Sequence, residues 1–176
     1  MRLKSCSGRA RVRKSVAVEK SRVLQIAVDI FSPDRELPAE WGRLASAARE
    51  ACAGSYAPYS GFSVGAAVEL ASGTVLRGAN QENGSYPCGL CAERVALFSA
   101  MAVEGREPVR RMAVAARRGT QWVQRPVTPC GACRQVMLEV AQMQRGTFAL
   151  LMLGELESLV VRDVRALLPL AFTLDA

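Results

Sequence analysis

Four of the six cysteines form two Cys-x-x-Cys pairs, Cys88 with Cys91 and Cys130 with Cys133, in a chain of 176 residues that contains no histidine. In a chain without an export signal, such pairs favour metal or redox chemistry over structural disulfides. Any transition-metal site must therefore use thiolates and carboxylates, and any acid–base step must use Glu, Asp, Tyr or Cys. If both pairs bind one ion, the fold has to bring two distant segments together.

The apolar segments alternate between patterns typical of strands and patterns typical of helices. Such alternation predicts a layered α/β domain in which helices cover a sheet. Between residues 62–70 and 75–79, a short turn sequence predicts a hairpin. We expect strands at 23–31, 62–70, 75–79, 112–116 and 147–153, helices at 38–54, 90–104 and 130–142, a loop at 118–127, and a last helix that ends near Leu168 and Pro169.

The net charge of +7 comes from the first segment of the chain. Residues 1–22 hold eight of the 23 basic residues and one of the 16 acidic ones, which leaves 15 of each in the remainder. We expect 1–22 to be a basic, disordered extension, 23–37 a strand and turn, and 38–176 the catalytic domain. The neutral remainder argues against a nucleic-acid-binding surface. Because no apolar stretch approaches the length that spans a bilayer, we expect a soluble, cytoplasmic protein.

The two cysteine pairs allow two kinds of zinc site. Four thiolates would make a closed structural site, whereas a catalytic site uses three protein ligands and keeps one position open for water. Glu93, two residues after Cys91, favours the catalytic site, because a structural site has no use for it. Hydrolytic removal of an amino group needs a carboxylate that moves protons between water, a ring nitrogen and the departing amine.

Both cysteine clusters lie where a predicted loop runs into a predicted helix. The positive end of each helix and its unpaired N–H groups would lower the pKa values of the thiols. Three thiolates give a divalent ion a net charge of about −1, which weakens its effect on bound water. Arg94, and less clearly Arg134, would withdraw part of that charge by donating hydrogen bonds to the sulfurs.

Four ordered motifs stand out in the sequence, at residues 56–67 (YAPYSGFSVGAA), 80–87 (NQENGSYP), 91–94 (CAER) and 128–135 (TPCGACRQ). Together they resemble the motifs of the cytidine deaminase family, in its homotetrameric branch with three cysteine ligands. Zinc deaminases that act on nucleobases share the last two as a general layout. The resemblance implies a three-layer α/β/α fold with a mixed central sheet, one Zn²⁺ per subunit, and conversion of cytidine and deoxycytidine to uridine and deoxyuridine in pyrimidine salvage.

The resemblance also implies roles for individual residues. Cys91, Cys130 and Cys133 would bind zinc, and Glu93 would be the catalytic proton carrier. The implied substrate contacts are Phe62 against the pyrimidine, Asn80 and Glu82 to the ribose hydroxyls, the backbone near Ala92 and Thr128 to the base, and Tyr86 and Phe172 across a subunit interface. Cys88 departs from the pattern, since a residue that does not bind the metal is expected at its position.

Three other functions remain open from the sequence. The first is deamination of another cytosine-containing small molecule of the blasticidin type on the same fold. The second is a structural zinc module with four cysteine ligands, for which Glu93 would be idle. The third is a thiol-redox protein that uses Cys130 and Cys133, which would leave Cys91 unexplained.

Overall fold

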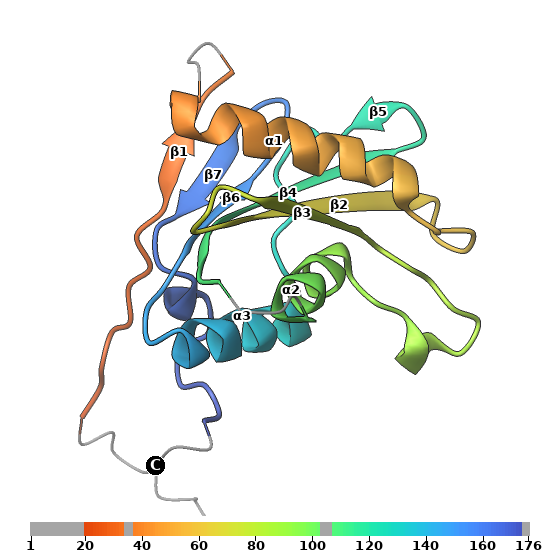
Figure 1. The fold of residues 1–176 in the computed structure, drawn as a ribbon. Helices are drawn as coiled ribbons and strands as arrows, with labels where there is room; N and C mark the ends of the chain where they lie inside the picture. The colour runs from red at the N-terminus through yellow and green to blue at the C-terminus, as the bar shows by residue number, and fades with distance from the viewer. Residues whose placement is uncertain (1–19, 34–36, 103–106, 174–176) are drawn as a thin grey trace, which may run out of the picture.

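The computed structural model describes residues 20–33, 37–102 and 107–173. It is a three-layer α/β/α domain, with one helix on one face of a mixed sheet and two on the other (Figure 1). This confirms the expected fold class. In chain order the elements are β1 (Asp29–Phe31), α1 (Ala39–Ala51), β2 (Phe62–Leu70), β3 (Val75–Ala79), α2 (Ala92–Ala102), β4 (Val109–Arg118), β5 (Gln121–Trp122), α3 (Gly131–Met143), β6 (Ala149–Met152) and β7 (Ser158–Val161).

The sheet order is β1-β7-β6-β4-β2-β3, and β5 pairs with the end of β4. The pair β4 and β6 is parallel, and the other strand pairs are antiparallel. Single 3₁₀ turns lie at Cys52–Gly54, Tyr86–Cys88 and Val164–Leu167. In chain order α3 lies between the parallel strands β4 and β6, so it belongs to the crossover that connects them over one face of the sheet (Figure 1).

Alternating side chains of the central strands divide the core into two halves. On β2, Val68 packs toward α2 and α3, whereas Ala67 packs toward α1. On β4, Val114 and Ala113 are divided in the same way. This follows from the two-residue period of a strand. Small residues on the α1 side allow that helix to lie close to the sheet, while larger aliphatic residues fill the space under the other two.

Two glycines set the close approach of helices to the sheet. A Cβ atom added to Gly65 on β2 would lie 2.2 Å from the carbonyl oxygen of Ala48 in α1. One added to Gly78 on β3 would lie 2.4 Å from the backbone nitrogen of Ala96 in α2. No other residue fits such contacts without displacing the helix. Gly78 therefore fixes how deeply the first turn of α2, which begins directly after Cys91, lies against the sheet.

Strands at the sheet edge differ from the sequence prediction. The predicted strand at 23–31 is wrong except for its last three residues, which pair with β7. Residues 20–28 are exposed and form no regular element. β7 itself was not predicted. Its four residues lie between a turn and the short 3₁₀ turn Val164–Leu167, which takes the place of the predicted last helix.

The remaining elements lie close to their predicted positions. The hairpin strands at 62–70 and 75–79 are confirmed at both ends. The strand predicted at 112–116 extends to Val109–Arg118, and part of the predicted loop folds back on it as β5. The predicted extension 1–22 lies mostly outside the described residues. None of the helices in the described part of the chain has the length and apolar character that crossing a membrane requires.

Candidate active site

Three cysteines meet between the starts of α2 and α3. Cys91 directly precedes α2, Cys130 is the N-cap of α3, and Cys133 lies in the first turn of α3. Their sulfur atoms all lie within 4.8 Å of one another. The distance from Cys91 Sγ to Cys130 Sγ is 3.8 Å, and that from Cys130 Sγ to Cys133 Sγ is 3.5 Å. Two helix starts with their free N–H groups thus converge on one group of thiols.

The spacing of this group is close to that of a zinc site. Two sulfurs bound at about 2.3 Å to a tetrahedral zinc ion lie about 3.8 Å apart, near the distances of the two contacts that Cys130 makes. Cys88 is not part of the group, although it completes the first Cys-x-x-Cys pair. It is exposed at the end of the Tyr86–Cys88 turn, and its thiol contacts the hydroxyl of Ser85 at 3.7 Å. The geometry therefore favours three metal ligands over four.

Arg94 is the cation nearest the thiols. Its Nη2 donates to the carbonyl oxygen of Gly89 at 3.1 Å and approaches Cys91 Sγ at 3.9 Å. A hydrogen bond from Cys133, assisted by Arg94, lowers the pKa of the Cys91 thiol to about 5. The same interaction with Cys91 raises the pKa of Cys133, and burial acts in the same direction. The site thus readily holds negative charge, as a metal site with thiolate ligands must.

Arg134 does not contact the cysteine sulfurs, although the sequence had suggested that it would donate a hydrogen bond to them. Its Nε donates to the carbonyl oxygen of Pro129 at 2.8 Å, and its Nη1 donates to that of Leu167 at 3.3 Å. Arg134 therefore ties the segment before Cys130 to the last 3₁₀ turn of the chain. Its contribution is to hold a backbone segment, and the charge near the thiols comes from Arg94.

Glu93 is the buried carboxyl group of the site. It lies in the first turn of α2, is only 5% exposed, and lines the same cavity as Cys91 and Cys130. Burial raises the pKa of Glu93, and the negative charge of Cys91 acts in the same direction. A raised pKa makes the carboxylate a better proton acceptor, which favours a role as a general acid–base group.

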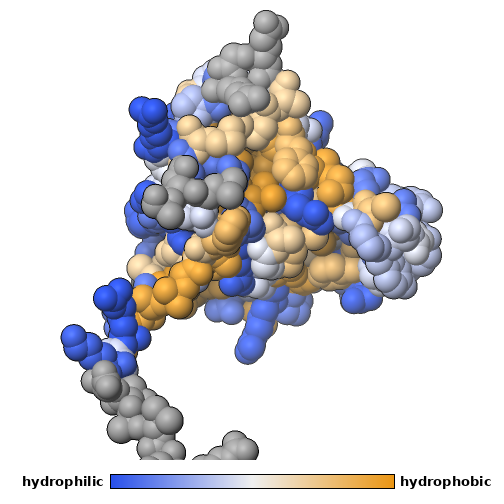
Figure 2. Space-filling view, turned by 90° about the horizontal axis from the view of Figure 1, so that it is seen from below, coloured by the Kyte–Doolittle hydropathy of each residue, from blue (hydrophilic) through white to orange (hydrophobic). Residues whose placement is uncertain are grey.

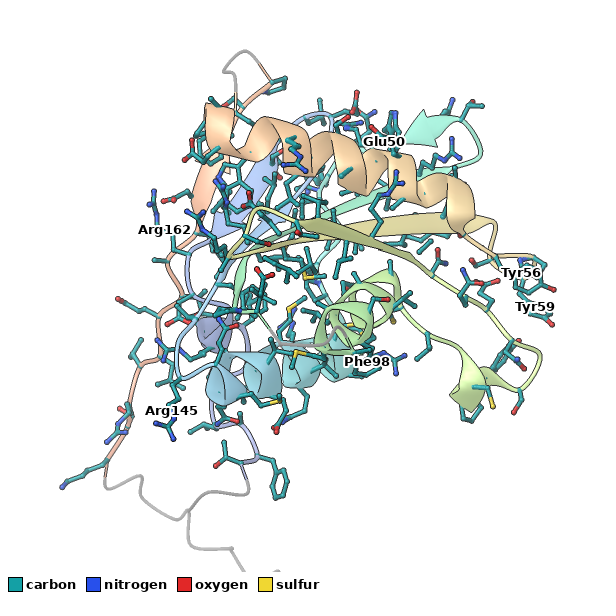
Figure 3. The ribbon with its side chains drawn as sticks, in the orientation of Figure 1. Glu50, Tyr56, Tyr59, Phe98, Arg145 and Arg162 are labelled. Carbon is teal, nitrogen blue, oxygen red and sulfur yellow. The ribbon has the colours of Figure 1, made fainter. Side chains whose placement is uncertain are left out.

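The cavity has a volume of about 650 Å³ and suits a small organic molecule. It is lined by the loop before β2, the segment between β3 and α2, the start of α2, and the loop before α3. Tyr56 and Tyr59 mark this end of the sheet, opposite the end that carries Arg162 (Figure 3). The rings of Tyr59 and Tyr86 meet edge to face, with 6.3 Å between their centroids, so the two sides of the cavity mouth touch.

Most of the residues singled out in the sequence line this cavity. They are Asn80, Glu82, Tyr86, Cys91, Ala92, Glu93, Arg94, Thr128 and Cys130. Cys133 lies behind them, buried, as part of the thiol group. The fold therefore brings residues from separate segments of the chain to one cavity. The order and spacing of the motifs do not show this directly.

Two of the predicted substrate contacts do not line the cavity. The ring of Phe62 lies 5.3 Å from the guanidinium carbon of Arg118, and Val64, two residues later on the same strand face, lines the cavity instead. Phe172 is 71% exposed, and its carbonyl oxygen accepts a hydrogen bond from Gln135. Val64 and Tyr59 were missed as site residues, although both belong to the motif at 56–67 that signalled the site.

The chain matches the family model for the cytidine and deoxycytidylate deaminase zinc-binding region over residues 40–149, more than half of its length. The cytidine deaminase of Halalkalibacterium halodurans is 46% identical over 122 residues, which are 69% of this chain and 86% of that protein. The cytidine deaminase of Sporosarcina psychrophila is 37% identical over 131 residues, 74% of this chain and 90% of that protein.

Two solved structures of cytidine deaminases are also similar to this chain. The crystal structure of cytidine deaminase from Burkholderia pseudomallei has a TM-score of 0.65 and 39% identity, and the match covers 77% of this chain and all of that chain. The cytidine deaminase from Mycobacterium tuberculosis has a TM-score of 0.60 and 35% identity over 78% of this chain. The family model covers more than half of the chain, and the Halalkalibacterium halodurans protein is 46% identical to it. The chain therefore belongs to the cytidine and deoxycytidylate deaminase family.

Proposed function

We propose that this protein is a zinc-dependent cytidine deaminase that converts cytidine and deoxycytidine to uridine and deoxyuridine with release of ammonia. The observation that carries the proposal is the buried Glu93 in one cavity with the three-cysteine group. A structural zinc site would not place a buried carboxyl group beside its ligands in an open cavity of this size.

The three thiols would hold the zinc ion, and Arg94 would withdraw part of their negative charge. A zinc ion with three protein ligands supplies a Lewis acid that makes water a nucleophile near neutral pH. The N–H groups at the starts of α2 and α3 favour the thiolate form of the ligands and hold their positions. Free thiols persist in a reducing compartment, which supports placing the enzyme in the cytoplasm. Deamination of nucleosides there would serve pyrimidine salvage.

Glu93 would move the protons of the reaction. It accepts a proton from the attacking water and delivers it to the ring nitrogen next to the amine-bearing carbon. After water oxygen has added to that carbon, Glu93 takes the remaining hydroxyl proton and delivers it to the amino group. The carbon–nitrogen bond breaks and ammonia leaves, so that one water is consumed for each nucleoside. Burial of Glu93 supports this role because it excludes bulk water from these transfers.

The substrate would lie between the thiol group and the cavity mouth. Asn80 and Glu82 would bind the ribose hydroxyls, and the backbone near Ala92 and Thr128 would bind the base. That all four residues line the cavity supports these roles. Val64 supplies the apolar wall that the sequence assigned to Phe62. The ring of Phe62 lies against the guanidinium group of Arg118.

The direct test is an assay of ammonia release by the metal-replete protein. Separate reactions contain cytidine, deoxycytidine, their 5′-monophosphates, blasticidin S and a short single strand that contains cytosine. We expect release from the two nucleosides. Release from blasticidin S alone would show the same chemistry on another small molecule, and release from none of them would contradict the proposal.

We propose further that the enzyme is a homotetramer whose active sites are shared between subunits. Tyr86 at the cavity mouth is 78% exposed, and Phe98 of α2 and Met143 of α3 are also exposed. The face covered by α2 and α3 shows a hydrophobic area near its middle (Figure 2). Phe98, which Figure 3 labels beside α2, is among the exposed residues. Phe172, exposed beyond the last turn, is a candidate to reach a neighbouring cavity.

Light scattering on the purified protein is expected to give a mass of about four chains. Replacing Phe172 by alanine should then lower activity without changing the zinc content, because the residue would close a neighbour's cavity and bind no metal. A monomeric mass together with full activity would contradict the shared site.

A further inference from the structure

Ser55 lies outside the cavity but contacts a residue that lines it. It follows the 3₁₀ turn Cys52–Gly54 after α1 and is half-buried. Its hydroxyl donates a hydrogen bond of 2.6 Å to Oδ1 of Asn80. The backbone next to it is bound to the same segment, because Tyr56 N donates to the carbonyl oxygen of Asn80 at 3.0 Å. Ser55 is thus held at one fixed place against the Asn80 amide.

The hydrogen bonds of Asn80 determine which way its amide group faces. Oδ1 also accepts from the backbone nitrogen of Val64 at 2.8 Å, so both acceptor positions of this oxygen are used. Nδ2 donates to the carbonyl oxygen of Phe62 at 2.9 Å, which uses one of its two N–H groups. Asn80 can therefore offer a ligand in the cavity only the second N–H of Nδ2, as a donor.

Glu82, two residues later, is held as the complementary group. Its Oε2 accepts hydrogen bonds from the backbone nitrogens of Tyr59 at 2.9 Å and Ser60 at 3.2 Å. A hydrogen bond from the Ser60 side chain, with those from the backbone, lowers the pKa of Glu82 and keeps it ionised. The loop of residues 55–60 thereby fixes one donor and one acceptor side by side at the cavity wall.

We propose that Ser55 is a positioning residue that makes Asn80 a hydrogen-bond donor to a sugar hydroxyl of the substrate. The proposal rests on the proposed function. The Ser55 hydroxyl occupies an acceptor position of Oδ1 and restrains rotation of the amide group. Without it, one of the three bonds that hold the amide is lost, and Oδ1 regains an acceptor position that competes with the intended donor.

The test compares Ser55→Ala with the wild type on cytidine, 2′-deoxycytidine and 3′-deoxycytidine. We expect kcat/KM for cytidine to fall about 3- to 10-fold, the range of one ordinary hydrogen bond, mainly through a higher KM. On one of the two deoxynucleosides, which lacks the hydroxyl that Asn80 contacts, the loss should disappear. Ser55→Thr keeps a hydroxyl and should restore most of the activity on cytidine.

Ser46→Ala is the matched control, because it removes an exposed hydroxyl that binds Glu50 on α1, away from the cavity. It should leave all three substrates unaffected. An equal loss on all three substrates in Ser55→Ala, or no loss at all, would overturn the positioning role. If the wild type releases no ammonia from cytidine, the proposed function fails, which is a different result from an active enzyme that is indifferent to Ser55.

Discussion

Replacement of Glu93 by glutamine is expected to lower kcat by about 10⁴-fold and to leave about one zinc ion bound per chain. Glutamine has nearly the shape of glutamate, so the packing around this buried side chain should change little. Its amide cannot accept a proton from water and return it to the ring nitrogen or the amine. The loss should therefore be in turnover, with the metal site intact, because Glu93 is not one of the sulfur ligands.

Two measurements on the same preparation check this expectation, ammonia release at saturating cytidine and the zinc content by elemental analysis. Glu139→Gln on the exposed side of α3 makes the same chemical change away from the cavity and should keep wild-type turnover. A residual rate above about 1% in Glu93→Gln would remove its assigned role in proton transfer, and loss of zinc would place it among the metal ligands.

Replacement of Cys91 by alanine is expected to abolish both zinc binding and activity, whereas replacement of Cys88 by alanine should change neither. The two residues belong to one Cys-x-x-Cys pair, but only Cys91 lies in the group whose sulfurs are within 4.8 Å of one another. Removal of one of three ligands leaves two thiolates, too few for a stable site. Cys88 is exposed, with its thiol directed to Ser85.

Zinc content and ammonia release after dialysis distinguish the two variants. The expected values are near zero for Cys91→Ala and near one ion per chain for Cys88→Ala. Should Cys88→Ala also lose its zinc, the site would have four thiolate ligands and a structural role. The wild type with its metal removed by a chelator should resemble Cys91→Ala and recover when zinc is returned, which the variant cannot do.

Local sequence pattern was sufficient to indicate the candidate catalytic residues. Cys91 and Glu93, and likewise Cys130 and Cys133, stand at the starts of predicted helices, and the structure confirms that α2 and α3 begin there. Short spacings within one helical turn determine which side chains share a side, so the sequence indicated the chemistry without knowledge of the fold. The two strands of the β2–β3 hairpin were predictable for the same reason, since alternation and a tight turn are local features.

The choice between three and four sulfur ligands required the tertiary structure. From spacing alone Cys88 and Cys91 were equivalent, and only the path of the segment between β3 and α2 leaves Cys88 outside the group. The position of β7 beside β1 likewise depends on a pairing across more than 120 residues, for which a four-residue strand carries no local signal.

The sequence by itself therefore indicated the candidate reacting residues, the three-layer class and the family. The tertiary structure decided which side chains line the cavity and which groups they contact. Val64 lines the cavity while Arg118 covers Phe62, and Ser55 turns the amide of Asn80 into a donor. The physical reason is that a motif records residue types at short separations, whereas the direction of a hydrogen bond depends on every group that competes for the same atom, and these come from different elements.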